Sequence, residues 1–201
     1  MDVFLIALLV AGGMHLLKSR YQAGRVALLG SYLAPFQLEK LMESLTQGYL
    51  RALGESDPDR QVPIWAMLGV QETDLADQFN RFATAFSGVA EAQARVSTLP
   101  VALPYASQLL PKATFDMRRV LAVHARGIEE AVQNHRGLVP RERAYRLSAE
   151  LFLMQHTCHW YCRSRAIASA RLLARHQTTY AQVLAALAPS TRQAYEAVLA
   201  T

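Results

Sequence analysis

The residue types most able to do chemistry gather in one uncharged segment, Leu151–Cys162, which reads LFLMQHTCHWYC. It holds both cysteines of the chain and two of its six histidines. On a helix, His156, Cys158, His159 and Cys162 lie within one broad face, with pairs three and four residues apart. Imidazole and thiolate groups at such spacings can bind one metal ion.

A fifth candidate ligand, His124, lies on the apolar face of the preceding predicted helix. An alternative function is therefore a metal- or haem-binding helical protein that uses His124, His156, Cys158, His159 and Cys162. The ligand pattern is incomplete, because Cys-x-x-Cys, Cys-x-x-Cys-His and Glu-x-x-His are all absent. Free cysteine is ordinarily a small buried hydrophobe, and histidine beside aromatic residues can be a satisfied core group. The favoured interpretation is structural and assigns no cofactor, with a redox thiol as a further alternative.

Arginines form the second set, since all but three of the 21 basic residues are arginine. The planar guanidinium suits carboxylate and phosphate contacts. Cations near the start of a helix oppose its dipole, which makes a binding role there conceivable. We predict a partner-binding surface on one long helix, formed by Arg141, Arg143, Arg146, Arg163, Arg165, Arg171 and Arg175.

The partner that this surface predicts is an acidic protein subunit, with anionic lipid as a second possibility. A soluble nucleic-acid binder is a further alternative, which the absence of helix-turn-helix, zinc-finger and RNA-recognition signatures disfavours. Gly-x-Ser-x-Gly, the phosphate-binding loop and Gly-x-Gly-x-x-Gly are also absent. We therefore expect no catalytic residues and a protein that is not an enzyme.

The elements that carry these residues are all predicted to be helical, because no sustained strand-type alternation occurs. The long helix is expected from Pro140 to about Arg175. Shorter helices are predicted over 35–53, from 72–74 onward, over 114–134 and over 178–187. A terminal helix is expected from Ser190, which has the capping-box spacing with Gln193.

The amino-terminal run VFLIALLVAGGMHLL, residues 3–17, contains no charged side chain and is followed by Lys18, Arg20 and Arg25. As a helix it spans about 22 Å, somewhat less than the hydrocarbon core of about 30 Å. A single membrane anchor is favoured over a cleaved signal peptide, which needs a basic start, and over a buried core helix. The positive-inside rule then places the amino terminus outside and the remaining chain in the cytoplasm.

Composition agrees with one domain of 201 residues behind this anchor, with 52% hydrophobic and 18% charged residues. This balance excludes a disordered chain, and two cysteines exclude a disulfide scaffold. The net charge of +5 is uneven, because residues 1–100 carry eight basic and ten acidic side chains and the remainder thirteen and six. Residues 97–111 carry no charge and three prolines, which predicts an apolar loop that covers the core, touches the membrane or receives a partner.

The sequence therefore predicts an all-α fold, with an anchor helix and juxtamembrane amphipathic segment over residues 1–34 and a helical domain over 35–201. The predicted function is a non-catalytic subunit or adaptor of a bacterial envelope complex, held in the inner membrane by one span. Its expected contact surfaces are the arginine-rich helix and the apolar proline-containing loop.

Overall fold

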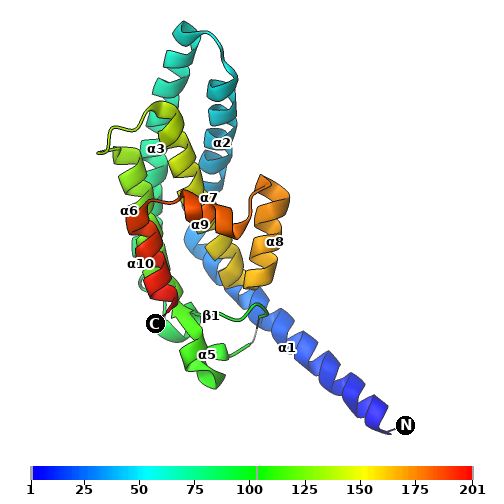
Figure 1. The fold of residues 1–201 in the computed structure, drawn as a ribbon. Helices are drawn as coiled ribbons and strands as arrows, with labels where there is room; N and C mark the ends of the chain where they lie inside the picture. Colours follow the sequence, from blue (N-terminus) through cyan, green and yellow to red (C-terminus); the bar gives the residue numbers. More distant parts are fainter. Residues whose placement is uncertain (1, 103, 201) are drawn as a thin grey trace.

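Helix α1 (Asp2–Leu33) runs without interruption through the predicted anchor and on into the helical bundle (Figure 1). It belongs to a computed structural model that describes residues 2–102 and 104–200. Among these residues, Val3–Leu33 is the stretch long and apolar enough to cross a membrane, and its most apolar window is 0% buried. Residues 3–17 are thus no buried core helix. The predicted all-α architecture, an apolar amino-terminal helix followed by a bundle, is confirmed.

The second half of α1 is part of the bundle. Leu29 is buried in the core, and Leu28, Tyr32 and Leu33 pack against it. The buried Gln22 side chain accepts a hydrogen bond from Arg163 at 2.9 Å. The end of the segment predicted as juxtamembrane therefore packs on the helical domain.

Helices α2 (Leu38–Gly54) and α3 (Pro58–Phe86) form an antiparallel hairpin. The predicted start of the second helix at 72–74 is wrong by more than a dozen residues. Asp57 caps α3 by accepting a hydrogen bond from the Asp59 amide at 3.0 Å, and Pro58 occupies the first turn, where its missing N–H costs nothing. Pro63 follows within the first two turns of the same helix.

A short antiparallel hairpin lies between α3 and α6, contrary to the expectation of helices alone. Arg95 of β1 pairs with Asp116 of β2, and Ser97 pairs with Thr114. Strands of three residues are too short to give a readable alternation, so the sequence offered no signal. The segment comprises α4 (Glu91–Ala94), β1 (Arg95–Ser97), α5 (Ala106–Leu109), a 3-10 turn (Pro111–Ala113) and β2 (Thr114–Asp116).

Helix α6 (Met117–Gln133) begins three residues later than predicted, because Thr114 is a strand residue. Its cap is Asp116, which accepts from the Arg118 amide at 2.9 Å. The predicted helix over 140–175 is in fact two helices, α7 (Pro140–Cys162) and α8 (Arg165–His176). The buried Ser164 separates them and caps α8 through the Ile167 amide at 3.3 Å.

The chain ends in α9 (Tyr180–Ala186) and α10 (Pro189–Leu199). The capping box predicted at Ser190 and Gln193 is wrong, because Ala188 is the residue before α10 and gives no side-chain cap. A capping box does occur at α9, where Thr179 and Gln182 hydrogen-bond reciprocally. Both sites have the same spacing, so spacing alone could not choose between them.

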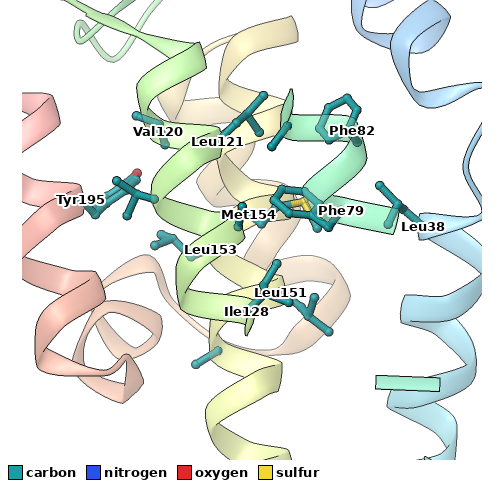
Figure 2. Packing of buried hydrophobic residues seen from close by; sticks show 14 of the residues in the cluster. Leu38, Phe79, Phe82, Val120, Leu121, Ile128, Leu151, Leu153, Met154 and Tyr195 are labelled. Carbon is teal, nitrogen blue, oxygen red and sulfur yellow. The ribbon is translucent and has the colours of Figure 1, made fainter. Parts of the chain in front are cut away.

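The core lies where α3, α6 and α7 pack together, with α10 closing one side (Figure 2). Phe79 and Phe82 of α3 face Leu121 and Ile128 of α6, and all four are fully buried. The phenylalanine side chains of α3 are therefore part of the core. Burying each such side chain contributes about 1.5–3 kcal/mol of transfer free energy.

Candidate functional site

The histidine and cysteine residues singled out in the sequence divide between the core and the surface. His124, on α6, is completely buried, and its Nε2 lies 3.0 Å from the Thr157 hydroxyl of α7. Burial, and to a lesser degree the neighbouring His156, lowers the His124 pKa to about 3. A neutral imidazole that bonds across two helices is a packing group.

His156, on α7, is also a packing group. Its Nε2 lies 3.0 Å from the Ser169 hydroxyl of α8, and its ring stacks on Tyr180 at 4.5 Å. Burial lowers its pKa to about 4, and the positive charge of Arg165 acts in the same direction. The side chain thus ties α7 to both α8 and α9.

The two cysteines are free and half-buried. Burial raises the pKa of Cys162 to about 11 and that of Cys158 further, so both are protonated thiols at neutral pH. The Cys158 thiol has the Met154 sulfur as its partner at 3.9 Å. Reactive cysteines require a lowered pKa, so this environment disfavours the redox alternative.

The five candidate metal ligands do not converge. Across residues 2–102 and 104–200 there is no group of three or more His, Cys, Asp or Glu side chains placed to hold a metal ion. His124 and His156 each use one ring nitrogen on a hydroxyl group, as described above. The alternative of a metal site therefore has no ligand set in the described structure.

The arginines at the start of α7 have partners within the protein. Arg143 forms an ion pair with Glu72 of α3 at 3.0 Å, and the Tyr49 hydroxyl of α2 donates to the same carboxylate at 2.7 Å. Arg146 donates to the Ala186 carbonyl oxygen at 2.8 Å. Arg141 lies over the Tyr145 ring at 5.8 Å. These contacts reduce their availability as a docking surface.

Two of the remaining arginines are also engaged. Arg163 donates to Gln22 of α1, and Arg165 lies between the rings of Trp160 and Tyr180, 5.3 and 5.2 Å from their centroids. Arg171 and Arg175 are exposed on α8, and no hydrogen bond or ion pair joins either to another described side chain. The seven predicted arginines therefore do not form one surface, and the two without such a partner lie in the second half of α8.

Arg171 and Arg175 border a groove between α2 and α8, which we call the α2–α8 groove. Its two overlapping parts have volumes of about 790 and 370 Å³ and share residues of α1, α2 and α7. Leu33, Leu38 and Met154 are among its apolar lining residues. Five of the predicted site residues line this groove. They are Cys158, His159 and Cys162 of α7, Arg163 directly after it, and Arg171 of α8.

The walls of the groove differ in charge. The α8 side carries Arg171 and Arg175, and the α2 side carries Glu39 and Glu43 with Lys40 beside them. Burial lowers the His159 pKa, and both arginines lower it further, so this imidazole is neutral at pH 7. Apolar contacts between oppositely charged walls suit an amphipathic polypeptide segment.

Sequence analysis missed the buried carboxylates Glu72 and Glu150. Glu72 is 1% exposed and Glu150 is 0% exposed. Burial raises the pKa of Glu150 to about 7, while the Thr191 hydroxyl and the Ala188 amide lower it in part. A signal was present, because each glutamate is flanked by leucine three or four residues away on one helix face. The α2 wall of the groove gave no such signal, since only the fold brings it opposite α8.

No family model matches the chain, and comparisons with curated proteins and with solved structures give no match.

Proposed function

We propose that this protein is a non-catalytic, single-pass membrane-anchored adaptor that holds its bundle at the cytoplasmic face of a bacterial inner membrane. The observation that carries the proposal is α1, whose first half projects from the bundle while its second half is packed into it. Exposed apolar patches larger than a few hundred Å² mark interaction or membrane surfaces. Phe4, Leu9 and Met14 are 76%, 66% and 66% exposed, on several sides of one helix.

The orientation follows from the cations after the anchor. Arg25 is bonded to the bundle, where it donates to the Tyr161 carbonyl oxygen at 3.0 Å. Lys18 and Arg20 are left as the juxtamembrane cations of α1, and Lys or Arg beside a span favours the cytoplasmic side. The amino terminus would then lie outside, with the bundle in the cytoplasm.

The adaptor role is supported by the α2–α8 groove. Arg171 and Arg175 are its free cations, and charged groups at an interface give specificity and steer association. We propose that the groove binds an amphipathic helix of a partner protein, with acidic side chains toward α8 and apolar side chains toward Leu38 and Met154. Alternatively, Arg171 and Arg175 are part of a solvated helix face that binds no partner. The crosslinking experiment described below distinguishes these two roles.

The anchor is tested by fractionation of the full chain. Wild-type protein is expected to stay in membranes after an alkaline carbonate wash and to retain its full intact mass. The double variant Leu5→Arg/Leu9→Arg is expected to leave the membrane, because each arginine at the centre of a span costs about 2.5–3.5 kcal/mol. Leu50→Arg/Val70→Arg is the matched control, since both side chains are exposed on the bundle. Wild-type protein that washes off, or that has lost its amino terminus, overturns the anchor.

The groove is tested with a photo-crosslinking residue placed at Arg175, and at Arg126 on α6 as a control. Crosslinks only from position 175, to a partner peptide that contains Asp or Glu, are expected. Arg171→Glu, in the chain that carries the photo-crosslinking residue at position 175, should abolish the crosslink, and charge reversal in the identified peptide should restore it. Equal crosslinking from both positions, or no effect of Arg171→Glu, contradicts binding in the groove.

A further inference from the structure

The loop over residues 97–111 exposes apolar side chains at an unusual density. Val101, Tyr105, Leu109 and Leu110 are 62%, 46%, 64% and 45% exposed. Residues 97–111 contain no Asp, Glu, Lys or Arg. Surface loops are ordinarily polar and seldom present four large apolar groups to water. A surface of this composition calls for an apolar neighbour.

The position of the loop indicates which neighbour this is. The Tyr105 ring packs against Tyr21 of α1, with the centroids 5.6 Å apart. Tyr21 follows the last apolar residue of the anchor, Leu17, by four residues, or about 6 Å along a helix axis. Helix α5 lies at the end of the bundle from which α1 projects (Figure 1). The loop is therefore at the level where a bilayer surface would begin.

The fold holds the loop in this position. The Pro100 carbonyl oxygen accepts a hydrogen bond from the Ala166 amide of α8 at 3.1 Å. The Thr98 amide and hydroxyl both donate to the Ala113 carbonyl oxygen, at 2.9 and 3.1 Å. Val101 and Ala102 also line a small cavity with Tyr21 and Gln22. The apolar side chains are presented by a tethered loop beside α1.

The first charged side chains after the anchor and on either side of the loop in the sequence are basic. Lys18 and Arg20 follow the anchor, and the exposed Lys112 follows the loop. Residues 3–38 and residues 92–115 contain no Asp or Glu. Lysine and arginine near a membrane surface favour binding of anionic lipid. Tyrosine favours the headgroup level, and Tyr21 and Tyr105 form a pair there.

We propose that this loop is a second membrane contact, in which Val101, Leu109 and Leu110 enter the headgroup–acyl boundary and Lys112 meets lipid phosphates. The inference rests on the proposed function, because the bilayer is the one that α1 spans. The loop was predicted to cover the core, touch the membrane or receive a partner, and here we assign lipid as its neighbour. A second contact beside the span fixes the rotation of the bundle about α1, which one helix alone leaves free.

Fluorescence quenching in nanodiscs tests this contact on the full chain. Cys158→Ala/Cys162→Ala provides a background in which a single cysteine carries an environment-sensitive fluorophore. The labelled variants are Leu109→Cys, Leu9→Cys in the anchor, and Leu50→Cys, which is 69% exposed on α2. The discs contain phosphatidylethanolamine and phosphatidylglycerol, with or without lipid that carries a nitroxide near the top of its acyl chain. Leu110→Cys repeats the loop measurement, and circular dichroism checks each fold.

The expected result is quenching at Leu9 and at Leu109, with fluorescence at Leu50 unchanged. Quenching at Leu9 without quenching at Leu109 or Leu110 overturns the membrane contact and leaves the anchor intact, as a protein partner for the loop would require. Quenching at Leu50 equal to that at Leu109 also overturns the membrane contact, because lipid would then reach the loop no more than it reaches another exposed part of the bundle. The absence of quenching at Leu9 overturns the anchor and the inference together.

Discussion

Burial fixes the protonation of several side chains within the bundle. His124 and His156 have lowered pKa values and stay neutral in the folded protein down to acidic pH. Glu150 has a raised pKa of about 7 and so retains its proton in the folded protein while the unfolded chain loses it. The two histidines therefore destabilise the fold as pH falls below about 6.5, the usual histidine pKa. Glu150 instead destabilises the fold as pH rises from about 4.5 through 7.

Replacing Glu150 with glutamine should raise stability in a pH-dependent way. The folded pKa of about 7 exceeds the usual 4.5, so the stabilisation present below pH 4.5 is lost as pH rises through 7. The unfolding free energy of Glu150→Gln, relative to wild type, is expected to increase by about 3 kcal/mol between pH 4.5 and pH 7.5. Urea unfolding in mild detergent, followed by tryptophan fluorescence, measures it.

The exposed Glu142, on the same helix, provides the control for that experiment. Glu142→Gln should shift stability by less than about 0.5 kcal/mol at either pH. A constant difference between Glu150→Gln and wild type across the range would show that Glu150 ionises normally.

At the scale of elements, the sequence predicted the existence of helices better than their ends. Asp57, Asp116 and Ser164 each cap a helix, yet the apolar periodicity pointed to other starts. The break between α7 and α8 contains neither glycine nor proline, and only the capping serine marks it. Boundaries are decided by which hydroxyl or carboxylate reaches a backbone amide, and periodicity carries no record of that.

Helices α6, α7 and α10 pack closely together at Gly127. A Cβ atom at this position would lie 2.5 Å from Glu150 Oε2 and 2.8 Å from Thr191 Oγ1. Gly127→Ala should therefore destabilise the fold by about 1–3 kcal/mol through overpacking, although alanine favours a helix. Thermal unfolding measures the loss. Gly24→Ala on α1 is the control, since nothing lies within 4 Å of its Cβ position, and a loss of equal size there would contradict close packing at Gly127.

For the molecule as a whole, an apolar amino-terminal helix followed by a helical bundle was predictable, because an uncharged run and abundant helix formers are local properties. The α2–α8 groove was not predictable, because its walls come from segments more than a hundred residues apart. Which of the seven arginines have partners inside the protein was not predictable for the same reason. Arg143 looked like a surface cation until the fold placed Glu72 against it.

Arg25 should govern how firmly α1 is joined to the bundle. Its guanidinium donates to the carbonyl oxygens of Tyr161 and Arg95 and lies 4.7 Å from the ring centroids of Tyr21 and Tyr161. Arg25→Ala is expected to speed amide hydrogen exchange over residues 21–33 in nanodiscs, because hydrogen bonds to charged groups contribute about 1.5–3 kcal/mol each. Arg20→Ala, at an exposed position, should leave exchange unchanged. Equal exchange in both variants would mean that apolar packing alone holds the helix.

Helix α1 has no break between its apolar first half and the half that packs in the bundle, so the orientation of one half determines that of the other. Transmembrane helices are tilted by about 20° on average from the membrane normal. A helix whose apolar stretch is longer than the bilayer is thick tilts further. Because α1 continues without a break into the bundle, the bundle would rotate through the same angle as the membrane-spanning part of α1. The α2–α3 turn, at the end of the bundle away from the amino terminus, would move furthest. In the proposed anchored protein, bilayer thickness would therefore set the orientation of the bundle relative to the membrane.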